Sequence, residues 1–170
     1  MYWEPLSDAL NIPKSYQRWL AITGSMTKAL QDAAQSECHM NVQNESWQIP
    51  WTDELNDLPP MTTPYWIRET ILIVKHPALF ARAVFPKEFT EHFPDIFELG
   101  TRPLGQLIFT NNRFQRSNIR IAKMSGHASL SQKIPPTLKQ NEYWARRSLF
   151  HSHLPPFLLT EVFFSYVATL

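Results

Sequence analysis

The sequence predicts a single α+β domain over residues 1–170, with an antiparallel sheet and with helices gathered early and in the middle of the chain. Runs of apolar, aromatic and β-branched residues follow one another with turn signals between them, without the strand–helix alternation that parallel sheets need. Helical periodicity is confined to residues 13–35 and 87–111. The length of 170 residues suits one domain that buries roughly 70% of its unfolded-chain surface.

Two short helices are expected first. Residues 13–23 open with a proline suited to a first helical turn, and the pattern stops at Gly24. Ser25 then offers an N-cap for a second helix over residues 26–35. The main-chain N–H groups beside Met26, in the first turn of that helix, have no intrahelical acceptor, and such a helix start can bind an anion.

A hairpin is the clearest β signal. Residues 65–74 (YWIRETILIV) are rich in aromatic and β-branched residues, a turn is expected over 75–78, and a second strand follows over 79–86. Residues 38–51 alternate less regularly and predict a further strand before it. The stretch 52–64 has the composition of a loop.

The second half of the chain supplies the remaining elements. They are a broken helical segment over 87–100, a short helix capped by Thr101 that begins near Pro103, and strands over 114–124, 143–150 and 157–166. The polar stretch 125–142, with its Pro-Pro pair, is expected to be a loop without structure of its own.

Composition excludes several functions. The chain has 14 Pro but only 4 Gly, and the glycines lie too far apart for a phosphate-binding loop. The formal net charge is +1 and Lys and Arg are scattered, so we expect no nucleic-acid partner. Neither a secretory signal nor a membrane span is expected, because the N-terminus is not basic and the apolar run 71–74 is far shorter than the ~20 residues that cross a bilayer.

The single cysteine, Cys38, can form no intrachain disulfide, which is compatible with a reducing compartment. We therefore expect a cytoplasmic protein. Separately, we expect a monomer.

Two charged residues interrupt apolar strand patterns. Arg68 lies in a strand that is apolar on both faces, and it must meet a carboxylate of the protein or of a ligand, since an unpaired buried charge is very costly. Glu161 shares a strand face with large apolar residues. If that face points inward, we expect a raised pKa and a role as general acid or base; if the strand is an edge, Glu161 lies in water. Whether Arg82 shares a face with Arg68 depends on the register of the hairpin turn.

Other motifs give weaker signals. His151 and His153 form an H-x-H pair, but no third ligand is evident and no metal is expected. Cys38 has no accompanying pattern of a nucleophile. Arg146 and Arg147 either meet an anion or line a solvated strand edge.

Six strings, in order along nearly the whole chain, resemble the chorismate lyase (chorismate–pyruvate lyase) family. They are GSMTKAL (24–30), YWIRE (65–69), ARAVFP (81–86), LGTRPLGQLIFT (99–110), YWARRS (143–148) and PFLLTEVFF (156–164). The resemblance implies a six-stranded antiparallel sheet with helices packed on it and an enclosed ligand cavity. It also implies an enzyme without cofactor or metal that eliminates pyruvate from chorismate to give 4-hydroxybenzoate, the first committed step of ubiquinone biosynthesis in Gram-negative bacteria.

Carried over residue by residue, the family's ligand contacts fall on four positions of this chain: Met26, Arg68, Leu104 and Glu161. The resemblance thus assigns Arg68 and Glu161 to substrate binding and catalysis, and it leaves Arg82 as a candidate for the second carboxylate of the substrate.

The chain departs from the family pattern in four places. Family members commonly have glycine where this chain has Ala81 and Ala145, the loop 125–142 is longer than usual, and the turn at His76-Pro77 is slightly shorter. Two other hypotheses stay open at this point. One is a non-catalytic module, like the effector-binding domains of some bacterial transcription regulators, although the sequence offers no basic N-terminal unit to read DNA. The other is a family member that retains the product without making it.

Overall fold

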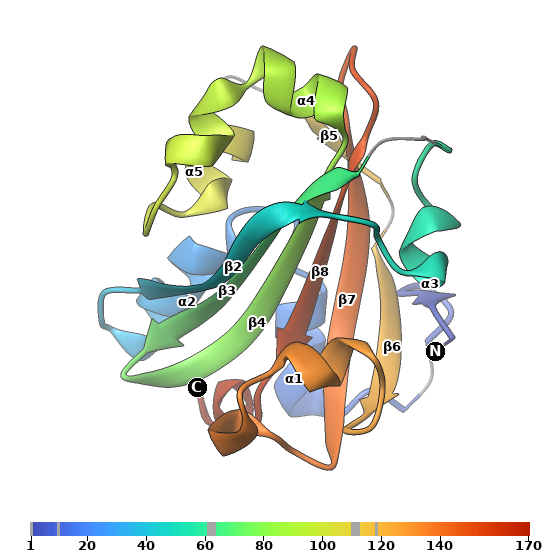
Figure 1. Cartoon of the computed structure of the whole chain (residues 1–170). Helices are drawn as coiled ribbons and strands as arrows, with labels where there is room; N and C mark the ends of the chain where they lie inside the picture. Colours follow the sequence, from blue (N-terminus) through green and yellow to red (C-terminus); the bar gives the residue numbers. More distant parts are fainter. Residues whose placement is uncertain (1, 10, 61–63, 110–112, 118) are drawn as a thin grey trace.

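The computed structural model describes residues 2–9, 11–60, 64–109, 113–117 and 119–170. Its centre is one antiparallel sheet of eight strands in the order β1-β6-β7-β8-β4-β3-β2, with β5 paired to β7 (Figure 1). The strands are β1 (Glu4–Pro5), β2 (His39–Gln48), β3 (Tyr65–Val74), β4 (His76–Phe85), β5 (Gln115–Arg116), β6 (Arg120–Ser125), β7 (Glu142–His151) and β8 (Phe157–Phe163). The expected α+β class is confirmed, but the expected six strands are wrong, because the short strands β1 and β5 join six long ones.

Helices flank this sheet. The α-helices are α1 (Lys14–Leu20), α2 (Met26–Ala34), α3 (Thr52–Leu55), α4 (Lys87–His92) and α5 (Leu104–Phe109), and the 3-10 helices are η1 (Pro94–Glu98), η2 (Leu130–Lys133), η3 (Pro136–Leu138) and η4 (Ser165–Thr169). Among the described residues, none of these helices has the length and apolar character needed to cross a lipid bilayer.

The β3–β4 hairpin fixes which residues share a face of the sheet. Lys75 makes the turn alone in the left-handed conformation, with φ 55°, so β4 begins earlier than expected. Arg68 is paired with Ala83, and Glu69 is paired with Arg82. Because neighbouring residues of a strand point to opposite faces, Arg82 lies on the face opposite Arg68.

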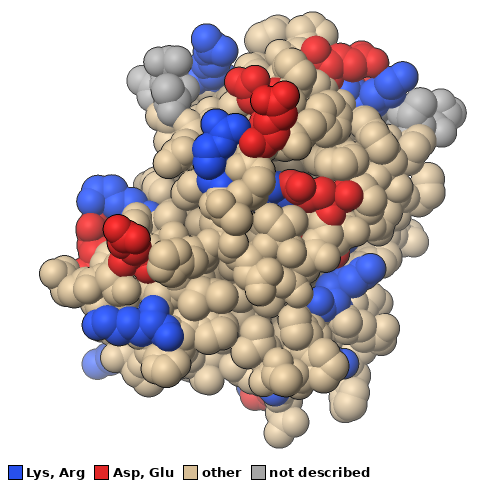
Figure 2. All heavy atoms as spheres, turned by 60° about the vertical axis from the view of Figure 1, so that its left-hand side comes forward, with Lys and Arg blue, Asp and Glu red and all other residues tan. Residues whose placement is uncertain are grey.

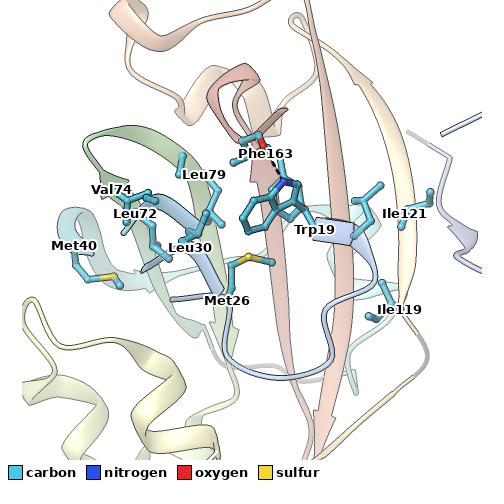
Figure 3. Close-up of a cluster of buried hydrophobic side chains, with 14 residues drawn as sticks. Trp19, Met26, Leu30, Met40, Leu72, Val74, Leu79, Ile119, Ile121 and Phe163 are labelled. Carbon is cyan, nitrogen blue, oxygen red and sulfur yellow. Dashed lines mark hydrogen bonds between the residues drawn. The ribbon is translucent and has the colours of Figure 1, made fainter. Parts of the chain in front are cut away.

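One face, here called the helix face, carries Arg68 and is covered by α1 and α2 (Figure 1). A buried apolar cluster joins these helices to the sheet, and Figure 3 shows Trp19, Met26 and Leu30 of the helices with Leu72 and Phe163 of the strands. The Trp19 indole Nε1 donates to the Val167 carbonyl at 2.8 Å and so ties α1 to the C-terminal 3-10 helix.

Aromatic side chains cover the far end of the helix face. Phe85, Phe89, Phe150 and Phe157 are buried there, and the Phe150 and Phe157 rings stack with centroids 5.0 Å apart. They pack with residues of η1 and α5, which explains why the segment after β4 folds back over the sheet.

The opposite face, here called the loop face, is covered by the segment 125–142 (Figure 1). This segment was expected to lack structure, yet it forms η2 and η3. Leu130 and Ile134 are buried against Ile71, Phe80 and Val162 of the sheet. The segment is therefore part of the core. Its contacts with the sheet order it, although its sequence has no helical or strand periodicity.

Two expected strands have different bounds. The strand expected over 114–124 is divided into β5 and β6, and the strand expected over 157–166 ends at Phe163, where η4 takes over. The two early helices and the Ser25 cap are confirmed, since the Ser25 hydroxyl accepts from the Lys28 main-chain N–H.

Candidate active site

A cavity lies on the helix face, between the sheet and the starts of α2 and α5. The sheet contributes side chains of β2, β3, β4, β5, β7 and β8 to its wall. Ala81 and Ala83 of β4 lie between the longer side chains of β3 and β8, and their small size leaves the space open. The cavity thus forms where the small residues of β4 face the starts of the two helices.

The structure brings together all four positions that the family resemblance names. Arg68 comes from β3, Glu161 from β8, Met26 from the first turn of α2 and Leu104 from the first turn of α5, and all four line the cavity. Arg68 and Glu161 are 3% and 4% exposed. These four residues lie far apart in the sequence. The folded sheet and the helices packed on it bring them into the wall of one cavity.

Arg68 has protein partners as well as its place in the cavity wall. Its Nη1 donates to the Glu45 carboxylate on β2, the residue paired with it across the strands. Its Nη2 donates to the Gly100 carbonyl at 2.6 Å, in the turn that leads to α5. The arginine therefore joins β2, β3 and the approach to α5 at the cavity.

Glu161 is bonded by two arginines. Its Oε2 accepts from Arg146 Nε at 2.6 Å and from Arg116 Nη2 at 3.3 Å. Burial by itself raises the pKa of this carboxyl, but the two guanidinium groups outweigh burial and hold the pKa below its ordinary value of 4.5. The raised pKa expected from the sequence is wrong, because the sequence pattern did not reveal the arginines. Glu161 is ionised at neutral pH, so it can accept a hydrogen bond or a proton there but cannot donate one.

Arg116 and Arg146 are cavity-wall residues that the sequence did not assign to the site. Both also donate to carbonyls that follow α1: Arg146 Nη1 to Ile22 at 2.5 Å, and Arg116 Nη1 to Thr23 at 3.1 Å. The sequence did mark Arg146 as a residue that either meets an anion or lines a solvated edge, and it is 1% exposed. No sequence signal marked Arg116, which lies in a two-residue strand.

Arg82 is not part of the cavity wall, so the structure does not support it as the ligand for a second carboxylate. On the loop face, its Nε donates to Glu54 at 2.7 Å and its Nη1 donates to Glu69 at 2.5 Å. Its guanidinium carbon also lies 3.8 Å from the centre of the Trp51 ring. The hairpin register places Arg82 there and so decides its role.

Ala81 and Ala145, the two departures from the family pattern, lie in different places. Ala81 lines the cavity, where its methyl group takes up space. Ala145 is buried on the loop face in the cluster with Phe80 and Val162. Only Ala81 is therefore placed to affect a ligand in the cavity.

The starts of α2 and α5 approach each other closely at the cavity. A Cβ atom at Gly105 would lie 3.2 Å from Ser25 Oγ, a tight contact. The absence of a side chain at Gly105 lets the first turn of α5 sit against the cap of α2. Met26 and Leu104 thus line the same cavity. Each lies in the first turn of its helix, where main-chain N–H groups have no intrahelical acceptor.

The remaining candidates stay outside the cavity. Within the described ranges, no three His, Cys, Asp or Glu side chains cluster as ligands for a metal ion. His151 is exposed, and the His153 ring lies 6.4 Å from that of His92. Burial raises the pKa of the Cys38 thiol to about 11, which opposes a reactive thiolate.

By its architecture this is an α+β protein with a cavity on one face of an antiparallel sheet, and Arg68, Arg116 and Arg146 lie in the cavity wall. The fold recurs in solved structures. The effector domain of PhnF from Mycobacterium smegmatis is similar with a TM-score of 0.57 at 12% identity, covering 84% of this chain and 90% of that chain. The C-terminal domain of the histidine utilization repressor from Pseudomonas syringae pv. tomato gives 0.55 at 8% identity, covering 76% and 93%. At these identities the likeness shows the fold alone.

The chain belongs to the chorismate lyase family, whose model matches residues 1–169. A chorismate pyruvate-lyase of Yersinia enterocolitica is 35% identical over 159 residues, which cover 90% of this chain and 83% of the relative. A probable chorismate pyruvate-lyase of Shewanella sp. (strain MR-4) is 30% identical over 167 residues, covering 95% and 85%. The family expected from the six strings is confirmed.

Proposed function

We propose that this protein is a lyase that eliminates pyruvate from chorismate and releases 4-hydroxybenzoate, the first committed step of ubiquinone biosynthesis. One observation carries the proposal: a single cavity gathers Arg68, Glu161 and the first turns of α2 and α5, the positions that the family resemblance assigns to the ligand. The cytoplasmic location, the monomeric state and the absence of a nucleic-acid partner stay predictions from the sequence. On the face seen in Figure 2, Lys and Arg lie interspersed with acidic and uncharged residues, which agrees with the last of these.

The charge of the substrate matches the groups at the cavity. Chorismate carries a ring carboxylate and an enolpyruvyl carboxylate, so its site needs cations or N–H donors. In this proposal Arg68 binds the ring carboxylate, because a guanidinium presents paired donors to a carboxylate. The main-chain N–H groups at Met26 and Leu104 add donors from two helix starts.

The reaction needs no oxidant or reductant. The bond between C3 and the enolpyruvyl oxygen breaks, and its electron pair leaves with that oxygen. The hydrogen on C4 leaves as a proton, the ring becomes aromatic, and the enolpyruvate takes up a proton on its methylene carbon to become pyruvate. Aromatisation supplies the driving force.

Glu161 acts in this scheme as an anion. Both arginines bond to its Oε2, and within the described part of the chain no hydrogen bond is made to its Oε1. We place the 4-hydroxyl group of the substrate at Oε1, where an ionised carboxylate accepts its hydrogen bond. The negative charge then lies beside C4, the carbon that gives up a proton. Exclusion of water by Leu104 and Ile108 strengthens these polar contacts.

The test is an assay of the purified protein with chorismate after removal of metal ions by a chelator. Absorbance follows 4-hydroxybenzoate, and a coupled dehydrogenase follows pyruvate. We expect equal amounts of the two products, formed faster than by spontaneous decay. Arg68→Gln, which replaces the guanidinium group by a shorter, uncharged amide, serves as the site control and should slow turnover.

Other outcomes separate the alternatives. Tight binding of 4-hydroxybenzoate without turnover of chorismate would identify a module that only binds the product. Neither binding nor turnover would overturn the assignment of the cavity.

A further inference from the structure

We propose that Arg116 and Arg146 bind the enolpyruvyl carboxylate of the substrate, while Arg68 binds the ring carboxylate. This inference rests on the proposed function and assigns the second carboxylate to two residues that the family resemblance does not name and that the mechanism above uses only as partners of Glu161. Arg116 and Arg146 take the role that the sequence suggested for Arg82, whose guanidinium donates to Glu54 and Glu69 on the loop face.

The first observation is an uncommitted donor. Arg146 lines the cavity, is 1% exposed, and uses Nε for Glu161 and Nη1 for the carbonyls after α1. Its Nη2 is buried and has no hydrogen-bond partner within the described ranges. A buried N–H group without a partner costs free energy, so a ligand oxygen that accepts from it recovers that cost.

The second observation is an excess of positive charge. Arg116 and Arg146 share one carboxylate, that of Glu161, so the three groups together carry a charge of +1. Burial lowers the pKa of Arg116 to about 10, and the residue stays cationic at neutral pH. By contrast, Arg68 is matched by Glu45. The excess cation of the cavity wall therefore lies on the Glu161 side.

The third observation is the order of these groups across the sheet. Arg68 is on β3, Glu161 is two strands away on β8, and Arg146 is paired with Glu161 from β7. Glu161 thus separates Arg68 from Arg146 by strand order, with neighbouring strands about 4.8 Å apart.

The connectivity of chorismate has the same order. The ring carboxylate on C1 is para to the C4 hydroxyl, while the enolpyruvyl ether on C3 is next to it. If Glu161 holds the C4 hydroxyl and Arg68 holds the C1 carboxylate, the enolpyruvyl group lies on the Glu161 side of the ring. Its carboxylate then meets Arg146 Nη2 and the second hydrogen of Arg116 Nη2.

The test uses the fact that the product 4-hydroxybenzoate has lost the enolpyruvyl group. In Arg146→Lys the lysine keeps a positive charge beside Glu161 but lacks the free Nη2 group. We expect its KM for chorismate to rise about 10- to 100-fold, the loss typical of a charge-assisted hydrogen bond, with a smaller change in kcat. The inhibition constant of 4-hydroxybenzoate should change by less than about 3-fold. Arg116→Lys should behave in the same way, and Arg68→Gln should weaken both ligands.

The unmodified enzyme gives an independent measurement, which does not depend on whether a variant folds. With chorismate as substrate, pyruvate and 4-hydroxybenzoate should both inhibit, and both should be able to bind one enzyme molecule at the same time, because they occupy separate parts of the cavity. Mutually exclusive inhibition, or an equal loss of chorismate and 4-hydroxybenzoate affinity in Arg146→Lys, would overturn the assignment of Arg116 and Arg146. Absence of turnover in the unmodified protein would instead overturn the proposed function.

Discussion

Both faces of the sheet bury arginines, but the two faces differ in how many carboxylates are bonded to those arginines. On the loop face Arg82 meets two carboxylates, those of Glu54 and Glu69, and Arg147 meets Asp53 and Asp57. Carboxylates outnumber these two arginines. All three nitrogens of the Arg82 guanidinium donate to acids, and its face lies against Trp51.

On the helix face, the buried arginines outnumber the carboxylates bonded to them. Arg68, Arg116 and Arg146 share only two carboxylates, those of Glu45 and Glu161, and Arg146 Nη2 has no partner within the described chain. A buried arginine whose donors all meet carboxylates has a structural role, because its loss would leave those carboxylates buried without a cation, whereas an arginine at a cavity with an unbonded donor is available to a ligand. Burial alone does not distinguish these roles; the partners do.

The largest expected effect is loss of stability from the loop face. Arg82→Leu leaves Glu54 and Glu69 buried without their cation, and we expect the free energy of unfolding to fall by about 3–5 kcal/mol. Urea unfolding measures this change. Lys28→Ala, which removes an exposed pair with Asp32, is the control and should change stability by less than about 1 kcal/mol. The comparison between the faces fails if Arg82→Leu is as stable as the parent but has lost turnover.

A pair of matched substitutions tests the two faces by activity. Glu161→Gln removes the charge beside the cavity, and we expect kcat for chorismate to fall at least about 100-fold, as for other groups that act on a proton. Glu69→Gln makes the same chemical change on the loop face. It should lower the unfolding temperature while turnover per folded molecule stays within a few-fold of the parent. Equal losses of turnover in the two variants would remove the distinction.

Glycine substitutions give a smaller contrast. A Cβ at Gly126 would collide with the main-chain carbonyl of Gln140, so Gly126→Ala forces the segment 125–142 to shift and should cost about 1–3 kcal/mol of unfolding free energy. In Gly105→Ala the added Cβ lies 3.2 Å from the Ser25 hydroxyl and at ordinary contact distance, 3.5 Å, from the Phe109 ring. This substitution should cost less than about 1 kcal/mol but raise KM for chorismate, because it separates α2 from α5. Gly24→Ala, with no atom within 4 Å, controls for the stability measurement.

The smallest expected effect is on the pH dependence of stability. The pKa of Glu161 is lower in the folded protein than its ordinary value of 4.5, so the unfolded chain takes up this proton first as the pH falls. The stabilisation from Glu161 is therefore fully present above about pH 4.5 and is lost as the pH drops through the folded-state pKa. Between pH 6 and pH 3.5 we expect Glu161→Gln to lose less unfolding free energy than the parent. A parent and variant with parallel pH profiles would contradict an ionised, arginine-bonded Glu161.

Much of the fold could be read from local patterns. The β3 range and the Ser25 cap match what apolar and β-branched runs and capping chemistry indicate, because both depend on residues close in sequence. The segment 125–142 could not be read in this way, since Leu130 and Ile134 are ordered by contacts with the sheet. The family strings located Arg68 and Glu161, while Arg116 gave no signal because its partners are up to 94 residues away.

Local patterns and the family strings are enough to predict the α+β class, the family, and two charges in apolar strands that need partners. The identity of those partners depends on the folded sheet. The β-bulge of the β3–β4 hairpin, between the Ile73–Pro77 and Leu72–Leu79 pairs, shifts the register by one residue and sends Arg82 to the loop face, and the pairing of β7 with β8 sets Arg146 against Glu161. Strand register is a long-range property, and a shift of one residue reverses every side chain. The charge state of Glu161 and the open donor of Arg146 therefore follow from the assembled sheet, not from the chain around either residue.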